Sequence, residues 1–196
     1  MNLSPDTKIA GVLAPLFALR GEDDLGIGDT GALREFIDWA AEIGFKLVQL
    51  LPINETGADN SPYNAISAIA IEPTTLQLAP NSPEELTRED FERSIADVDL
   101  PSLRRGPVNY RHVKNLKWRL LEKAFASFSE RASEERQSAF QTFCEEESAW
   151  LRDYAFFRVL VEESNGSAQW DRWPAQHQTT ERARSWRDEE IGRAHV

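Results

Sequence analysis

Two loops of this sequence carry residues whose types and spacing could do chemistry. In the first, residues 26–31 read Gly-Ile-Gly-Asp-Thr-Gly and match G-x-G-x-x-G, whose backbone amides bind the pyrophosphate of a dinucleotide. However, about nine residues separate Gly26 from Leu16, the end of the preceding apolar run, whereas the motif should follow its strand directly. The acids at 22–24 would also repel a phosphate. The sequence therefore disfavours a dinucleotide site.

The second loop contains Ser61-Pro62-Tyr63, flanked by Asn60 and Asn64. A serine hydroxyl can hydrogen-bond sugar hydroxyls, and a tyrosine ring can stack on a pyranose face while its hydroxyl donates. Proline fixes the backbone between the two side chains. The alternatives are structural: Ser61 as a turn residue, Tyr63 as a half-buried core aromatic, and both asparagines as turn formers. From the residues alone, both interpretations stay open.

The elements that must position these loops are a strand, a helix and a second strand. Residues 11–16 are a short apolar run closed by a proline, suitable for a strand that is buried on both faces. Residues 45–51 are a second apolar run, stopped by Pro52. Between them, apolar residues recur at helical spacing from Leu33 to Ala41. Asp29 or Thr30 can cap this helix, and Gly44 can end it. The pattern predicts a βαβ unit with parallel strands, whose carboxyl ends precede the two loops.

From residue 80 onward the sequence predicts helix after helix. Ser82-Pro83-Glu84-Glu85 is a predicted helix start, with a serine cap and proline at the first position. An apolar stripe over residues 113–128 predicts one long helix, and a similar pattern continues to Asn165-Gly166.

Composition and charge exclude several classes of protein. The 196 residues include 22 Lys+Arg against 33 Asp+Glu, a net charge of −11 that disfavours a nucleic-acid partner. The single cysteine, Cys144, excludes an intramolecular disulfide, and we expect no metal site. The apolar runs are far shorter than the roughly 20 residues that span a bilayer, so no membrane association is expected. The start lacks the features of a secretory signal, which predicts the cytoplasm.

The order of several motifs resembles the 4-alpha-glucanotransferases, the amylomaltase or disproportionating-enzyme family, glycoside hydrolase family 77. The motifs are the strand end Gln49-Leu50-Leu51-Pro52, the Thr56-Gly57 turn, Ser61-Pro62-Tyr63 and Ser67-Ala68. Leu25-Gly26-Ile27-Gly28-Asp29 resembles the first strand-to-helix loop of that family, residues 150–157 its helical insertion, and Trp170-Asp171-Arg172-Trp173-Pro174 its W-x-x-W-P turn. The resemblance covers roughly residues 9 to 175.

The resemblance implies an α/β fold: the start of a (β/α)8 TIM barrel, followed by a mainly helical insertion. Residues 1–80 would hold the first two strands and first helix, and residues 81–196 the insertion and a truncated tail. A complete barrel usually needs about 250 residues, so the barrel would be incomplete and the chain an amino-terminal fragment.

The implied activity is transfer of α-1,4-glucan segments between maltooligosaccharides by a retaining double displacement, without a cofactor. Ser61 and Tyr63 become candidate glucan contacts, with Asn60 and Asn64 as weaker ones. The three carboxylates that this chemistry needs lie on later barrel strands in the family, so no residue here is assigned a catalytic role and the chain alone is expected to be inactive. The alternative is a non-catalytic carbohydrate-binding or helical interaction protein. The oligomeric state stays open.

Overall fold

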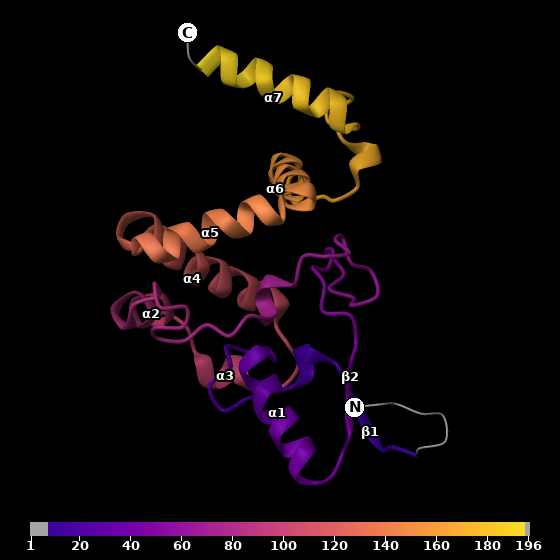
Figure 1. Ribbon diagram of the computed structural model, residues 1–196, viewed down its shortest axis with the longest axis vertical. Coiled ribbons are helices and arrows are strands. Elements are labelled where there is room, and N and C mark those ends of the chain that lie inside the picture. Colours follow the sequence, from indigo (N-terminus) through magenta and orange to yellow (C-terminus); the bar gives the residue numbers. More distant parts are fainter. Residues whose placement is uncertain (1–7, 195–196) are drawn as a thin grey trace. The chain divides into compact units, whose positions relative to one another are not determined.

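The computed structural model describes residues 8–194, which form two compact units divided between Gln137 and Ser138, within α5. Figure 1 shows the order of the elements along the chain. The first unit contains β1 (Gly11–Ala14), η1 (Leu16–Ala18), α1 (Thr30–Glu42), β2 (Leu47–Leu50), η2 (Pro73–Thr75), α2 (Arg88–Ile95), α3 (Leu100–Arg104) and α4 (Tyr110–Arg131). After α5 (Glu134–Glu146), the second contains α6 (Ser148–Glu163), η3 (Trp170–Arg172) and α7 (Thr180–Ala194).

The predicted βαβ unit is confirmed. β1 and β2 pair in parallel, from Gly11 opposite Leu47 to Ala14 opposite Leu50, and α1 connects them (Figure 1). Asp29 caps α1 by accepting from two backbone amides, and Gly44 follows its end at a φ of 97° that favours glycine. The sequence therefore contained both the periodicity and the end signals of this unit.

The prediction that residues 11–16 form a strand buried on both faces is wrong, and the second strand is likewise open to solvent. Leu13 of β1 is 54% exposed and Leu47 of β2 is 46% exposed. Within the described residues the sheet has only these two strands, so neither strand has a second neighbour to pair with. Apolar strand residues without neighbouring strands stay open to solvent, whatever their type.

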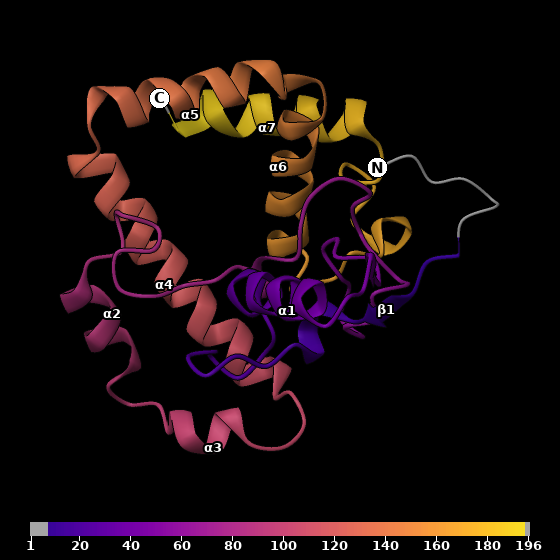
Figure 2. The same ribbon diagram turned by 60° about the horizontal axis from the view of Figure 1, so that its bottom comes forward.

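The core of the first unit lies against one face of α4. This helix confirms the predicted long apolar stripe, because Val113, Leu116, Leu120 and Ala124 are buried. They form one cluster with residues of the first loop and of the segment before α2: Leu25, Ile27, Leu78 and Leu86. α2 lies beside α4 in both views (Figures 1 and 2). The helices after residue 80 therefore share a core with the first strand-to-helix loop.

The predicted helix start at Ser82-Pro83-Glu84-Glu85 is wrong, since α2 begins at Arg88. The backbone of residues 79–86 instead forms turns in which the Leu86 amide donates to the Pro83 carbonyl and the Leu86 carbonyl accepts from Asn81. The Leu86 side chain is fully buried, and its burial favours these turns over a helical start. Thr87 caps α2 by accepting from the Asp90 amide at 3.1 Å.

The second unit is built around α6 and has a small core of Leu160, Val161, Trp173 and Ala183. The predicted helix end at Asn165-Gly166 is confirmed, because α6 ends at Glu163 and both residues adopt positive φ. α5 has no buried residues. In the part of the chain that the structure describes, no helix is long and apolar enough to cross a bilayer.

Candidate functional site

The glycines of the first loop serve packing. A Cβ on Gly28 would lie 2.1 Å from the Leu16 carbonyl oxygen, so only glycine fits there. The amides that could bind a phosphate are already used: Gly28 donates to Phe17 at 2.9 Å, and Gly31 donates to the Asp29 carboxylate at 2.9 Å. Because these two amides already have acceptors within the protein, they are not available to a pyrophosphate, which agrees with the sequence argument against a dinucleotide site.

The second loop, residues 51–72, leaves the carboxyl end of β2 and is the irregular coil above β2 in Figure 1. Two short antiparallel bridges shape it, one between Asn54 and Ile71 and one between Thr56 and Ala65. The loop thus returns to its starting point, with its foot near residue 72 and its tip at residues 59–64.

The buried carboxylate of Glu72 holds the foot of this loop. One of its oxygens accepts from the amide and the hydroxyl of Thr56, both at 2.9 Å. The other accepts from the amide of Thr74 at 3.2 Å and its hydroxyl at 2.8 Å. Burial alone would raise the pKa of Glu72, but these hydrogen bonds outweigh it and hold the pKa below its usual value. Glu72 is therefore an ionised structural acceptor.

Asp59 organises the tip of the loop, at Ser61 and Tyr63. Its carboxylate accepts from the Ser61 amide at 3.2 Å and from the Asn64 side-chain amide at 2.9 Å. These hydrogen bonds hold the pKa of Asp59 below its ordinary value. The backbone N–H of Asn64 donates to the Ser61 carbonyl at 3.0 Å, which closes a turn.

The four residues singled out from the sequence lie together at this tip, with different surroundings. Tyr63 is 75% exposed, so the alternative of a half-buried core aromatic does not hold. Ser61 is part of the turn, and its hydroxyl oxygen lies 3.4 Å from the Tyr63 amide. Asn60 adopts a φ of 55°, as a turn former does, and Asn64 pairs with Asp59. The structure therefore presents one free aromatic ring on a turn that its neighbours fix.

The space beneath the loop is too small for a sugar. The cavity between the second loop and the first has a volume of about 30 Å³ and is lined on the loop side by Asn54, Thr56, Asn60 and Pro62. That volume suits about one water molecule. Any sugar bound by this loop must lie on its outer surface, where Tyr63 is exposed.

The buried side chain of Lys117 connects separate segments of the core beneath the loop. Its Nζ donates to the Leu76 carbonyl at 2.6 Å and lies 3.8 Å from the Asp29 carboxylate. Burial lowers the pKa of Lys117 to about 8, although the charges of Asp29 and Asp24 act in the opposite direction. Sequence reasoning missed Lys117, Asp59 and Glu72, and only the Asp-x-Ser spacing at residue 59 hinted at a side chain that caps a turn.

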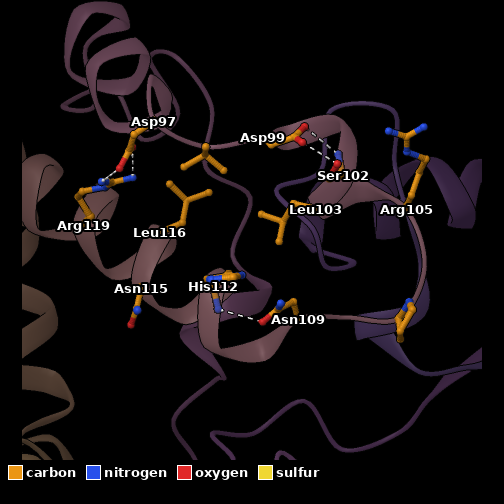
Figure 3. Close-up of a pocket in the computed structure, with 12 residues that line it drawn as sticks. Asp97, Asp99, Ser102, Leu103, Arg105, Asn109, His112, Asn115, Leu116 and Arg119 are labelled. Atoms are coloured by element: carbon orange, nitrogen blue, oxygen red, sulfur yellow. Dashed lines mark hydrogen bonds and ion pairs between the residues drawn. The ribbon is translucent and has the colours of Figure 1, made fainter.

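A larger pocket of about 780 Å³ lies between the α2–α3 turn and α4 (Figure 3). Its acidic side chains already have partners. Asp97 forms an ion pair with Arg119 at 3.0 Å, and Asp99 accepts from the amide of Ser102 at the start of α3. These groups stabilise helix ends and helix contacts, and the pocket is separate from the second loop.

Comparison with known proteins identifies the family. A family model described as 4-alpha-glucanotransferase matches residues 14–195. The 4-alpha-glucanotransferase of Chlamydia caviae is 34% identical over 167 residues, which cover 84% of this chain and 30% of that protein. The corresponding protein of Thermus thermophilus is 36% identical over 150 residues, which cover 76% of this chain and 28% of that protein. The chain thus spans about 30% of the length of the curated relatives it matches.

The fold agrees with this sequence similarity. The amylomaltase from Streptococcus agalactiae, solved in complex with acarbose, superposes with a TM-score of 0.68 at 28% sequence identity. The superposition covers 86% of this chain and 32% of that chain. Because the family model matches almost the entire chain and the fold agrees, this chain belongs to the 4-alpha-glucanotransferase family.

Proposed function

We propose that this chain is the part of a 4-alpha-glucanotransferase that carries a sugar-binding loop, and that Tyr63 and Ser61 contact an α-1,4-glucan there. Asn60 and Asn64 act at the same turn, mainly by fixing its backbone. Three observations support this proposal: membership of the family, the exposed ring of Tyr63, and the acarbose bound to the related amylomaltase.

In this proposal, residues 1–80 supply the first two strands and first helix of a TIM barrel, and residues 81–196 a mainly helical insertion and a tail. The parallel pairing of β1 and β2 supports it, as does the position of the second loop after the carboxyl end of β2, where such barrels hold their active sites. The exposed Leu13 and Leu47 are side chains that neighbouring barrel strands would cover.

The proposed reaction is a retaining double displacement, in which an aspartate forms a glucosyl intermediate and a glutamate acts as acid and then base. We assign neither role to residues 1–196. The best-placed carboxylates already have structural partners: Asp59 holds the turn, Glu72 the foot of the loop, and Asp24 pairs with Arg20 at 2.8 Å. We therefore propose that this chain alone transfers no glucan. Its location in the cytoplasm stays a prediction.

The exposed ring of Tyr63 carries the proposal, and a binding measurement tests it. We expect maltotriose to shift the NMR signals of residues 59–64, and Tyr63→Ala to weaken binding at this loop by about tenfold, the loss expected for one stacking contact. Ile69→Ala is the matched control, because Ile69 is an exposed apolar side chain of the same loop, 57% exposed, without a ring. Equal affinity of Tyr63→Ala and Ile69→Ala would refute the contact.

One observation favours the alternative of a helical interaction protein. α5 buries no side chain, and its Phe140 and Phe143 are 49% and 47% exposed. Under that alternative, maltotriose would leave residues 59–64 unchanged, and Phe140→Ala would weaken binding to a protein partner. Titration with maltotriose, followed at residues 59–64, therefore separates the two functions.

A further inference from the structure

Three arginines line one pocket between α6 and α7 in the second unit. The pocket has a volume of about 390 Å³, within the range of roughly 300–1,000 Å³ that small-molecule sites have. The arginines are Arg152 of α6 and Arg184 and Arg187 of α7, and the rest of the described lining is Asp153 and Phe156 of α6. We call this the arginine pocket. It lies within residues 152–187, far along the chain from the second loop.

Helical spacing brings these side chains together. Arg184 and Arg187 are three residues apart and lie on the same face of α7. Arg152 and Phe156 are four residues apart and share a face of α6. Ala183, next to the first arginine of α7, is fully buried in the core that α7 shares with α6. The packing of this core therefore sets the positions from which the arginines reach the pocket.

Two of the guanidinium groups are held by side chains of α6. Arg184 forms an ion pair with Asp153, in which one of its five N–H groups donates to a carboxylate oxygen. The guanidinium of Arg187 lies over the ring of Phe156, with 5.2 Å between its Cζ and the ring centroid. These contacts restrict two long side chains before any ligand arrives, which lowers the entropy that a ligand would otherwise lose by ordering them.

Arg152 is the third cation of the arginine pocket. Its side chain is exposed and has no hydrogen bond, ion pair or ring contact within the described part of the chain. A single arginine on a helix surface is normally just solvated. Here, however, it borders the same pocket as two arginines that are already held, so one anion can meet all three guanidinium groups.

The charge of the arginine pocket favours an anion with two negative charges. Three arginines and one aspartate give its described lining a net charge of +2, in a chain whose net charge is −11. A phosphate monoester carries about −1.5 to −2 charges at pH 7 and three acceptor oxygens. Guanidinium groups match such oxygens with two parallel N–H donors each. A carboxylate has one charge and two oxygens, so it would leave part of the positive charge unbalanced.

We propose that the arginine pocket binds a phosphate group, either as the free ion or as a monoester, with Arg152, Arg184 and Arg187 donating to its oxygens. This site is separate from Tyr63 and does not depend on the proposed function. Because the arginines are exposed, binding weakens as the salt concentration rises.

The test is a titration of the full chain with inorganic phosphate at pH 7, followed by the backbone NMR signals of residues 152–156 and 183–187. We expect saturable shifts, and about fivefold weaker binding in Arg152→Gln, the loss expected for one exposed charge pair. This substitution leaves the ion pair of Arg184 with Asp153 intact. Arg182→Gln is the matched control, because Arg182 is an exposed arginine of α7 outside the described lining, and it should bind like the unmodified chain.

Sodium chloride at equal ionic strength measures screening alone, and equal shifts with this salt would overturn the proposal. Equal affinities of Arg152→Gln and Arg182→Gln would also overturn it. Shifts with hexaglutamate but not with phosphate would show a surface for acidic peptides instead.

Methyl phosphate distinguishes the two sources of the phosphate group. Binding as tight as that of inorganic phosphate supports a monoester, and binding of inorganic phosphate alone supports the free ion. Tyr63→Ala should leave the phosphate shifts unchanged, so failure of this inference and failure of the proposed function are told apart.

Discussion

The buried ammonium group of Lys117 predicts that the protein becomes more stable as the pH rises from 7 to 10. Burial lowers the pKa of this side chain from its usual 10.5 to about 8, and the side chain is 1% exposed. Between these pH values the unfolded chain binds more protons at this residue than the folded chain, so the free energy of unfolding increases with pH.

The size of the effect follows from the two pKa values. One pKa unit corresponds to about 1.36 kcal/mol, so lowering the pKa of Lys117 from 10.5 to about 8 corresponds to about 3 kcal/mol over the whole interval. About 2.5 kcal/mol of this gain should appear between pH 7 and pH 10. Stopping at pH 10 limits the opposing effect of Tyr110, whose phenol pKa is raised by burial and by the charge of Glu72.

The assay is urea unfolding followed by circular dichroism at pH 7, 8, 9 and 10, for the unmodified chain and for Lys117→Met. Other titrating groups contribute equally to both proteins, so the difference between their unfolding free energies isolates Lys117. Lys123→Met, at an exposed position of the same helix, is the matched control and should follow the unmodified chain. A pH-independent difference between the unmodified chain and Lys117→Met, together with a lysine Cε signal for Lys117 that titrates near the usual 10.5, would refute the reasoning.

Two further substitutions test the supports of the two loops by the same unfolding assay. Glu72→Gln replaces one acceptor oxygen by an amide group that cannot accept, so it should lower the free energy of unfolding by about 2 kcal/mol because buried donors lose a charged partner. A decrease no larger than that for Glu35→Gln, at an exposed position of α1, would contradict this. Gly28→Ala should cost more than about 2 kcal/mol because its Cβ would lie 2.1 Å from the Leu16 carbonyl oxygen. Gly57→Ala, whose Cβ would meet its nearest atom at 3.6 Å, should leave the free energy of unfolding nearly unchanged. An equally small effect of Gly28→Ala would show that the close approach at Gly28 is easily relieved.

The sequence predicted those features whose physical cause is local. The helical period of α1, its Asp29 cap and its Gly44 end lie within the same short segment, and each is confirmed. The helix start at Ser82 was predicted from equally local signals and is wrong, because the burial of Leu86 depends on residues of α4 and of the first loop. Local preference is overridden where a distant core determines the position of a side chain.

The residues of the candidate site also fall into those that the sequence pointed to and those whose partners lie far away along the chain. Ser61 and Tyr63 stand out by residue type, and the family resemblance selected them, although their role as glucan contacts is still a prediction. Glu72 could not be found from the sequence, because its partner Thr56 lies 16 residues earlier and only the folded loop brings the two together. Lys117 adjoins the apolar stripe of α4, where a lysine normally reaches solvent, and the fold instead places its ammonium group beside Asp29.

The fixed foot of the second loop has a consequence for the entropy of sugar binding. Glu72 holds both Thr56 and Thr74, and Lys117 bonds to Leu76 nearby, so the backbone around the foot is ordered before any ligand arrives. Ordering a single side chain costs about 0.5–1.5 kcal/mol, far less than ordering a whole loop. In the proposed contact, a glucan has to restrict only the exposed ring of Tyr63, so the larger cost of ordering the loop backbone does not oppose the stacking contact.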